Sequence, residues 1–371
     1  MKGVEVNERL RKMNEIGQAP WVDEISRDDN QEGGLQSQVD EGIVGVTSNP
    51  SIFQSAIANS ELYDEQLEEL AREFDDPKEI FLRIAQKDIQ DACDILKPVY
   101  ERTEGKDGYV SLEVSPDLAY DTLATVEEAE RLVEMVDRPN LFVKIPATLP
   151  GLAAIEDMIA QGVSINVTLI FSLQRYRAVT RAYIRGLERL VAAGGDPSTV
   201  ASVASFFISR VDAKTDDRLD EIGREDLKGR LAIDNAKLVY QEFKEIFSGP
   251  EWEFLLSKGA TVQRPLWAST STKNPDYSDV MYVENLIGPD TVNTMPKATI
   301  DDVKDHAEIK ETIEEGIDAA RQLFKDLEEA GIDYDDITET LEMEGVQKFA
   351  DSYDELIEEI EQQTSKLAPQ A

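Results

Sequence analysis

The sequence predicts an α/β fold: a (β/α)8 TIM barrel with additional N- and C-terminal helices. Short apolar segments typical of β-strands alternate along the chain with longer stretches of helical periodicity. A polar residue also stands near the C-terminal end of most strand-like segments. Because the carboxyl ends of the strands carry catalysis in TIM barrels, the two observations together favour a barrel enzyme.

About eight strand-like segments follow one another along the chain. They are residues 21–25, 45–50, 109–114, 141–146, 165–170, 201–207, 265–270 and 291–295. Side chains two positions apart on a strand share a face, so the polar residues of these segments should point into the barrel together. The pairs concerned are Thr47 with Asn49, Ser111 with Glu113, and Asn166 with Thr168.

Helices should extend the barrel at both ends. One is expected over residues 7–16, and the chain is helical by pattern from Asp301 onward. The apolar repeat there consists of Ile309, Ile313, Ile317, Ala320 and Leu323, followed by Leu356, Ile357 and Ile360 on a last acidic helix before a loose tail. Since no linker rich in Pro, Gly or Ser divides the chain, we expect one domain over residues 1–371, with the barrel at about 20–300 and C-terminal helices at about 301–365.

The chain is strongly acidic, with 76 acidic and 38 basic residues and a formal net charge of −38. Acids occur in every helical stretch while 41% of residues are hydrophobic, which indicates a charged surface around an intact core. We interpret this as adaptation to a high-salt cytoplasm, where salt screens the self-repulsion. A surface for a basic partner is the alternative. No Lys/Arg cluster suits a phosphate backbone, so nucleic-acid binding is disfavoured.

The single histidine, the single cysteine and the absence of several motifs argue against other classes of protein. His306 is the only histidine, so neither a Ser-His-Asp triad nor a His-rich metal site is expected, and its charged surroundings predict a surface position. Cys93 is the only cysteine and is expected to be a buried thiol in a reducing compartment. Nucleotide-binding fingerprints, an apolar signal region and membrane-length apolar runs are absent. We therefore expect a soluble cytoplasmic enzyme without metal or organic cofactor; the oligomeric state stays open.

Lys144 is the most informative candidate, because it lies inside the apolar segment 141–146. Desolvation disfavours a charged amine, which should increase the neutral fraction that attacks a carbonyl to form a Schiff base. The alternative is a lysine on an edge strand whose amine reaches water. The polar residues on the neighbouring strand-like segments favour the Schiff base.

Several of these segments together resemble the transaldolase family. Residues 46–53 (VTSNPSIF), 142–148 (FVKIPAT) and 165–172 (INVTLIFS) are similar to its signature segments, and the resemblance runs from about Trp21 to Pro296 in the expected order. Residues 264–274 (RPLWASTSTKN) are most similar to the longer bacterial branch, some members of which are fused to glucose-6-phosphate isomerase. We expect no such fusion in a chain of 371 residues.

The resemblance implies a pentose phosphate pathway transferase. Such an enzyme moves a dihydroxyacetone unit reversibly from sedoheptulose 7-phosphate or fructose 6-phosphate to glyceraldehyde 3-phosphate or erythrose 4-phosphate. Lys144 would form the imine with C2 of the ketose phosphate, and Asp23 would remove the proton from its C4 hydroxyl. Glu113 would transfer protons through a water that Thr168 holds.

Substrate-binding residues are also implied by the resemblance. Asn49, Asn166 and Ser205 would hydrogen-bond the hydroxyls of the dihydroxyacetone unit. Phe207 would also line the substrate site, and a separate group would bind the phosphate: Arg210, Ser271 and Lys273. Many members have Arg where this chain has Lys273, so a point charge replaces a bidentate fork there. The alignment in this region leaves Ser269 as an alternative to Ser271.

Two other functions are alternatives for this sequence. A fructose-6-phosphate aldolase-like lyase would release dihydroxyacetone to water, but those relatives are shorter and carry Gln and Tyr where this chain has Glu113 and Phe207. A non-catalytic acidic barrel that binds a partner protein is the alternative of another class. The joint presence of Asp23, Glu113 and Lys144 argues against it.

Overall fold

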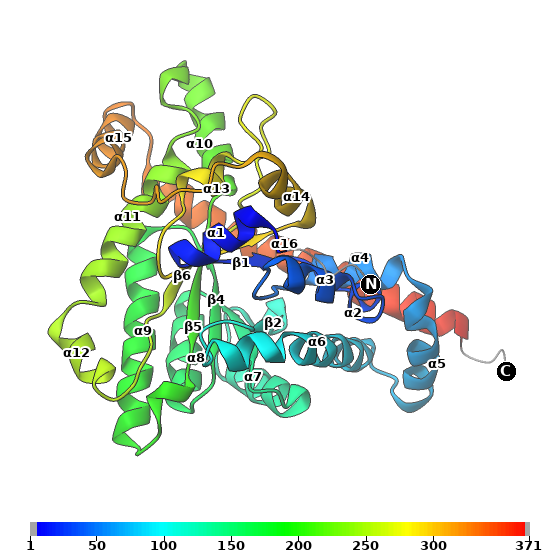
Figure 1. Cartoon of the computed structure of the whole chain (residues 1–371). Helices are drawn as coiled ribbons and strands as arrows, with labels where there is room; N and C mark the ends of the chain where they lie inside the picture. Colours follow the sequence, from blue (N-terminus) through cyan, green and yellow to red (C-terminus); the bar gives the residue numbers. More distant parts are fainter. Residues whose placement is uncertain (1–5, 368–371) are drawn as a thin grey trace.

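The computed structural model describes residues 6–367, in which seven parallel strands form one curved sheet in the order β1-β7-β6-β5-β4-β3-β2 (Figure 1). The strands are β1 (Gln18–Val22), β2 (Val110–Glu113), β3 (Leu141–Pro146), β4 (Ile165–Ile170), β5 (Ser202–Phe207), β6 (Arg264–Ala268) and β7 (Thr291–Met295). Every neighbouring pair is parallel, as expected when helices connect successive strands.

Residues 44–47, at the place of the expected second strand, close the sheet into a ring. Val46 forms parallel bridges with Val22 of β1 and with Val110 of β2. The Val46 amide donates to the Tyr109 carbonyl at 2.9 Å, and the Val22 amide donates to the Gly45 carbonyl at 3.0 Å. The expected barrel is confirmed, but its second strand is only this short segment, because the chain turns into a helix four residues after Val46.

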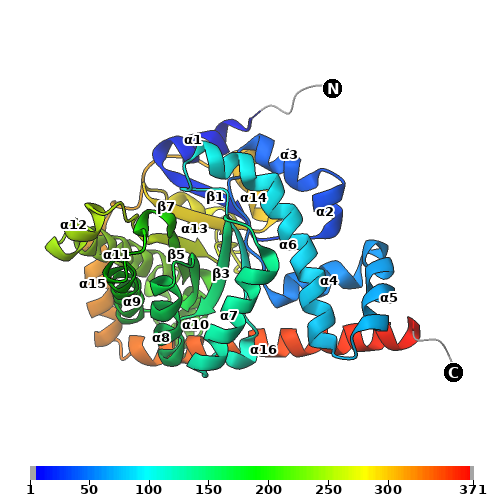
Figure 2. The ribbon, with the colours of Figure 1, turned by 90° about the horizontal axis from the view of Figure 1, so that it is seen from below.

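Helices surround the strands (Figures 1 and 2). They are α1 (Glu8–Ile16), α2 (Arg27–Gln31), α3 (Gly34–Glu41), α4 (Pro50–Ala58), α5 (Asp64–Glu73), α6 (Pro77–Arg102), α7 (Thr122–Val136), α8 (Leu149–Ala160), α9 (Leu173–Ala192), α10 (Ser209–Ile222), α11 (Leu231–Ile246), α12 (Pro250–Leu256), α13 (Met281–Asn285), α14 (Lys297–His306), α15 (Ile317–Glu329) and α16 (Tyr334–Leu367). The N-terminal helix is confirmed, and the Asn7 side chain caps it by accepting from the amides of Arg9 and Leu10.

The helical pattern expected from Asp301 onward is wrong in its middle. Residues 307–316 are not helical, although Ile309 and Ile313 are buried there. The amides of Thr312 and Ile313 both donate to the Ile287 carbonyl, at 2.9 and 3.1 Å, so tertiary hydrogen bonds replace helical ones. The final acidic helix is confirmed as α16, whereas the expected tail and the first five residues lie outside the described part of the chain.

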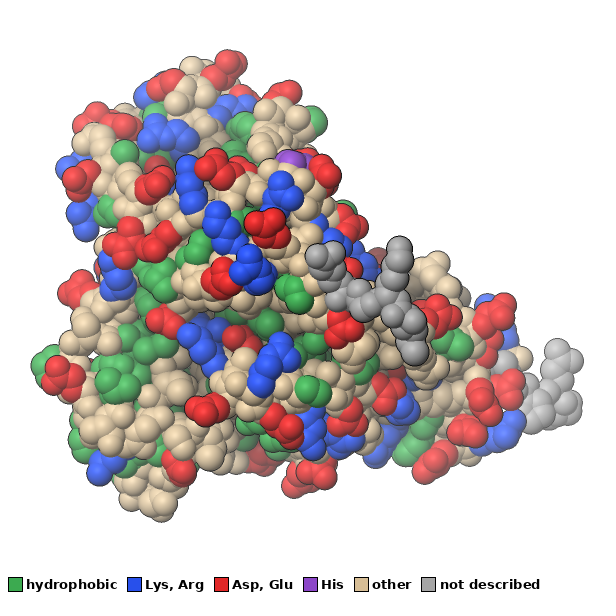
Figure 3. All heavy atoms as spheres, viewed as in Figure 1, with side chains coloured by type: hydrophobic (Ala, Val, Ile, Leu, Met, Phe, Trp, Pro, Cys, Tyr) green, Lys and Arg blue, Asp and Glu red, His purple; other side chains and the backbone are tan. Residues whose placement is uncertain are grey.

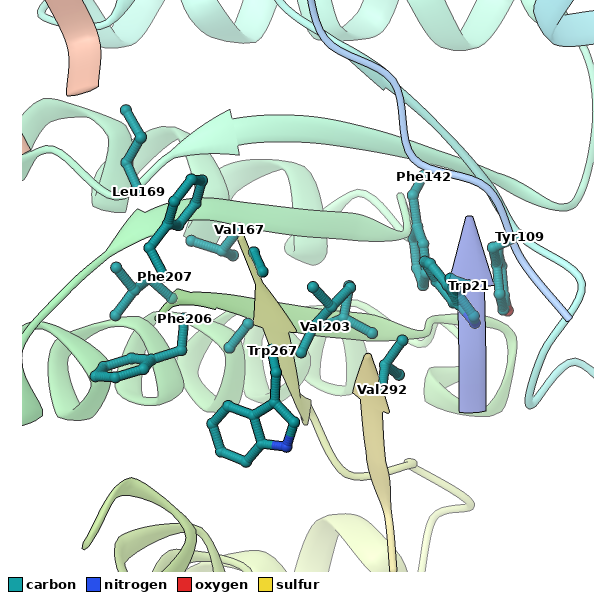
Figure 4. Packing of buried hydrophobic residues seen from close by; sticks show 14 of the residues in the cluster. Trp21, Tyr109, Phe142, Val167, Leu169, Val203, Phe206, Phe207, Trp267 and Val292 are labelled. Carbon is teal, nitrogen blue, oxygen red and sulfur yellow. The ribbon is translucent and has the colours of Figure 1, made fainter. Parts of the chain in front are cut away.

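Aromatic rings fill the interior of the barrel below its carboxyl end (Figure 4). Phe142 stacks on Tyr109 with ring centroids 4.0 Å apart and on Trp21 at 6.0 Å. Gly45 makes room for this stack, because a Cβ atom there would lie 2.4 Å from the Trp21 ring. The interior is therefore a packed core that supports the polar residues one layer above it.

The two singly occurring residues lie where the sequence predicts. Cys93 is completely buried in α6, and burial raises the pKa of its thiol far above the ordinary value. His306 ends α14 at the surface, with its Nε2 atom 2.9 Å from Asp279 Oδ1. Among the described residues, no helix combines the length and apolar character needed to cross a membrane.

Acidic side chains are scattered over the whole face seen in Figure 3 rather than gathered into one patch. Many basic side chains are paired with them; Arg189, for example, contacts both Glu156 and Asp157. With twice as many acids as bases, such pairing cannot neutralise the surface. On this face, the distribution fits a solvated acidic shell better than a single docking site for a basic partner.

We predict that withdrawing salt destabilises this fold. Surface carboxylates repel over a Debye length of about 30 Å at 0.01 M salt but only about 3 Å at 1 M. Thermal melting in increasing KCl should show the melting temperature rising steadily up to molar salt. An unchanged melting temperature across this range would contradict the interpretation of the surface as an adaptation to salt.

Candidate active site

A cavity of about 150 Å³ at the carboxyl end of the barrel brings together the residues predicted from the sequence. Its lining includes Asp23, Asn49, Lys144, Asn166, Thr168, Ser205, Phe207, Arg210, Ser271 and Lys273. Glu113 is the one predicted residue outside this lining, and its carboxylate contacts the Lys144 amine. Among the described residues, no three His, Cys, Asp or Glu side chains are grouped as metal ligands would be.

The Lys144 amine is enclosed inside the barrel. Its side chain is 8% exposed, and β3 lies between β2 and β4, so the alternative of an edge-strand lysine reaching water is wrong. The Nζ atom donates to the Ser48 carbonyl at 2.7 Å and to Glu113 Oε2 at 3.1 Å. Two oxygen atoms therefore hold the amine in place within its apolar segment.

Asp23 directly follows β1 and approaches the cavity from the other side. Its Oδ1 atom accepts a hydrogen bond from the Thr47 hydroxyl at 2.7 Å, and that hydroxyl lies 2.6 Å from Thr294 Oγ1. Burial raises the pKa of Asp23, while the charge of Lys144, the Thr47 hydrogen bond and Arg210 oppose this effect. The sequence reasoning noted the inward direction of Thr47 but not this contact, and it missed Thr294.

Glu113 ends β2, with a side chain that is 7% exposed. Burial raises the pKa of Glu113; the charge and hydrogen bond of Lys144 lower it, and the charge of Asp23 raises it further. The charge of the amine therefore acts on both carboxylates, but their hydrogen bonds differ. Glu113 contacts the amine directly, whereas Asp23 is hydrogen-bonded to a hydroxyl.

A hydrogen-bonded row of polar side chains lines the β4–β5 side of the cavity. Asn166 donates to Ser111 Oγ at 3.1 Å and accepts from the Ser205 hydroxyl at 2.6 Å. The pairing of β4 with β5 shifts register between Val167 and Ile170, and Leu169 adopts a positive φ of 60°. Such strain in a residue other than glycine is typical of functional sites.

Basic residues line a further side of the cavity. Arg210 lies in the first turn of α10, with its guanidinium carbon 5.1 Å from the Phe207 ring centroid. Burial lowers the pKa of Arg210 and the charge of Asp23 opposes this. Lys273 lies on the loop after β6 and donates to Ser271 Oγ at 3.0 Å.

Ser269 and Ser271 both line the cavity but have different partners. Ser269 has a positive φ of 58°, and its hydroxyl lies 2.9 Å from Ser209 Oγ at the start of α10. Ser271 instead contacts Lys273. This difference supports Ser271 as the hydroxyl that accompanies the basic group, although both stay candidates.

Two tyrosines that follow β6 donate hydrogen bonds to α10, a feature that sequence reasoning missed. Tyr277 donates to Asp216 at 2.7 Å, and Tyr282, beyond the loop, donates to Asp212 at 3.0 Å. Burial raises the pKa of Asp212 to about 7. Since α10 also carries Arg210, these hydrogen bonds fix the position of the loop relative to that guanidinium.

The last missed residue is Phe349, which comes from α16 and also lines the cavity. Its ring centroid lies 5.9 Å from Lys144 Nζ. The residue is 205 positions from Lys144 along the chain and sits in an acidic helix, so no local pattern placed it near the site.

Comparisons with known proteins show the family of this chain. A family model described as Transaldolase/Fructose-6-phosphate aldolase matches residues 20–360. The transaldolase of Frankia alni is 51% identical over 362 residues, which cover 96% of this chain and 98% of the relative. Transaldolase 2 of Nostoc sp. is 46% identical over 97% of this chain and 98% of its own length. The transaldolase of Mycobacterium leprae is 46% identical over 98% of both chains. The chain therefore belongs to the transaldolase/fructose-6-phosphate aldolase family.

Proposed function

We propose that this protein is a transaldolase that transfers a dihydroxyacetone unit between sugar phosphates through an imine on Lys144. The observation that carries the proposal is a lysine amine, enclosed in the barrel, with a carboxylate 3.1 Å away and a second carboxylate lining the same cavity. Family membership supports the reaction class. The protein would act as one domain over residues 1–371 in the cytoplasm, a reducing compartment that suits its single buried thiol.

In the first stage, the neutral amine of Lys144 attacks C2 of the ketose phosphate. Glu113 is close enough to accept a proton from the amine and, through a water held by Thr168, to return it to the carbinolamine hydroxyl. That hydroxyl leaves as water, and the iminium forms. A carboxyl group whose pKa is raised by burial is suited to both giving and taking a proton near neutral pH.

In the second stage, Asp23 removes the proton of the C4 hydroxyl. The bond between C3 and C4 breaks, its electrons move into the iminium to give an enamine, and the aldose phosphate leaves. A second aldose phosphate then adds to C3 by the reverse of these steps. The hydrogen bond from Thr47 holds the Asp23 carboxylate in one position during both directions of the reaction.

The remaining predicted residues would bind the substrate. Asn49, Asn166 and Ser205 offer neutral donors and acceptors for hydroxyl groups at the cavity wall. Phe207 packs beside the guanidinium of Arg210. That guanidinium, together with Ser271 and Lys273, would hold the phosphate.

The two alternatives receive less support. A lyase that releases dihydroxyacetone would use the same lysine, but the chain keeps Glu113 and Phe207 at the positions that distinguish the lyases in the resemblance. A non-catalytic barrel would gain nothing from burying two carboxylates beside an amine, since a buried ion pair is a poor source of stability. Ionisable groups with shifted pKa values inside a cavity favour catalysis.

Reductive trapping tests the proposal directly. Borohydride added with fructose 6-phosphate should inactivate the enzyme and leave a reduced dihydroxyacetone adduct on Lys144, identified by peptide mass spectrometry. Lys237 is a matched control, because the exposed fraction of the whole residue is 7% for Lys237 and 6% for Lys144. Lys237→Met should therefore still be trapped, and Lys144→Met should not. An adduct on another lysine, or none with any ketose phosphate, would refute the mechanism.

Variants of the two carboxylate residues should be impaired at different steps of the reaction. Asp23→Asn should nearly abolish cleavage of the C3–C4 bond while leaving Lys144 trappable, because the base acts after the imine forms. Glu113→Gln should also slow imine formation, by about 10²- to 10⁴-fold. Rapid-quench trapping separates these steps, and equal losses at every step in both variants would leave the assignment without support.

A pH profile checks the same assignment independently. Asp23 must be ionised to act as a base, and burial raises its pKa. As the pH falls, the ionised form is lost at a higher pH than for an exposed aspartate. The acid limb of kcat should thus lie above the usual aspartate range, and a kcat that is flat down to that range would contradict the role of Asp23.

Removing the lysine of the phosphate site should affect only phosphorylated substrates. A charged hydrogen bond contributes about 1.5–3 kcal/mol, and Lys273 is exposed, so Lys273→Ala should raise KM for fructose 6-phosphate by about tenfold. Cleavage of unphosphorylated fructose should scarcely change. Equal weakening of both substrates would mean that Lys273 supports the fold instead of binding phosphate.

A further inference from the structure

The C-terminal helix α16 crosses the carboxyl end of the barrel, as Figure 2 shows, and places one side chain in the active-site cavity. The Phe349 ring centroid lies 5.9 Å from Lys144 Nζ and 5.9 Å from the guanidinium carbon of Arg210. Phe349 is 7% exposed, so its ring is enclosed rather than lying loosely at the entrance.

Two contacts of the same helical face hold Phe349 in this position. Gly345, Phe349 and Tyr353 are spaced four residues apart and therefore lie on one side of α16. Gly345 approaches the barrel so closely that a Cβ atom there would lie 2.9 Å from the Leu169 side chain. One turn beyond Phe349, the Ser115 hydroxyl donates to the Tyr353 hydroxyl at 3.1 Å. The helix is thus fixed to the barrel on both sides of the phenylalanine.

The proposed reaction gives this position a specific consequence. Once the aldose phosphate has left, the enamine on Lys144 has two possible fates. It can add to the aldehyde of a new aldose phosphate, which is transfer. Alternatively, C3 takes up a proton and a water molecule adds to C2 of the resulting iminium; the C–N bond then breaks, releasing dihydroxyacetone and the free amine. The second route requires water to reach C2, beside the Lys144 amine.

We propose that Phe349 is a specificity-determining residue that keeps water molecules other than the one held by Thr168 away from C2 of the enzyme-bound three-carbon unit, so that transfer outweighs release. The ring occupies space next to the amine at the wall of a cavity of about 150 Å³. Truncating it to alanine would open room for further water beside the amine. This inference rests on the proposed function, and it assigns a role to a helix outside the segments that carry the family resemblance.

The test compares release with transfer in one set of variants. Free dihydroxyacetone is measured with fructose 6-phosphate alone, and sedoheptulose 7-phosphate is measured after erythrose 4-phosphate is added. Phe349→Ala should raise the ratio of release to transfer by about tenfold, which corresponds to a small change in the relative barriers. Phe349→Leu keeps most of the apolar volume and should stay near the wild-type ratio.

Matched controls separate this role from a general effect on the helix. Met343 lies on the same helix but is 61% exposed and does not line the cavity, so Met343→Ala should leave the ratio unchanged. If Phe349→Ala does not fold, Phe349→Val removes less volume and should raise the ratio in the same direction. An unchanged ratio in the truncated variant, or an equal rise in Phe349→Leu, would overturn the inference.

A failure of the role proposed for Phe349 is distinguishable from a failure of the proposed function. A wild-type enzyme that neither transfers the three-carbon unit nor becomes trapped by borohydride would refute the proposed function itself. A wild-type enzyme that does both, together with an unchanged ratio in Phe349→Ala, would refute only the role of Phe349.

Discussion

The contact between Lys144 and Glu113 is the interaction on which the site depends. Burial alone would favour the neutral form of each carboxyl group, and the charge of the amine opposes this for both Glu113 and Asp23. Removing the amine would leave two carboxylates inside the barrel without a cation between them. The pKa of Glu113 also depends on the charge of Asp23, so protonating one carboxyl group changes the other. Such coupling is useful in a reaction where protons must be given and taken back in turn.

The register of the sheet fixes this unit in space. Glu113 is paired with Lys144 across β2 and β3, and Lys144 is paired with Asn166 across β3 and β4. Three side chains at one level of the barrel are thus aligned by backbone hydrogen bonds alone. A slip of one residue in β3 would turn the amine out of the barrel, because alternate side chains face opposite sides. Rigid strands, rather than loops, set the geometry around the amine.

The residues on the strands were predictable from the sequence, because side chains alternate between the two faces of a strand and this alternation shows which of them point into the barrel. Lys144 was indicated by its apolar segment, and the inward direction of Glu113 by two-residue alternation. The structure places the two side chains in contact, with the Lys144 amine lining the cavity. Other features depend on contacts between distant segments. The loop at residues 307–316 has a helical repeat, but the amides of Thr312 and Ile313 donate to the Ile287 carbonyl. Of the expected strand at residues 45–50, only Val46 forms β-bridges. Phe349 and the Tyr277–Asp216 contact have no local signal for the same reason.

The charge of the cavity is opposite to that of the molecule. Among the residues that line it, Lys144, Arg210 and Lys273 are cationic and only Asp23 is acidic, although the whole chain has twice as many acids as bases. A phosphorylated substrate is therefore repelled by the surface at long range and attracted within the cavity. Salt acts on these two effects unequally, because repulsion across tens of ångströms is screened first and contacts within a buried cavity are screened least. A protein with this arrangement can keep an extremely acidic surface in concentrated salt and still bind an anion at its centre.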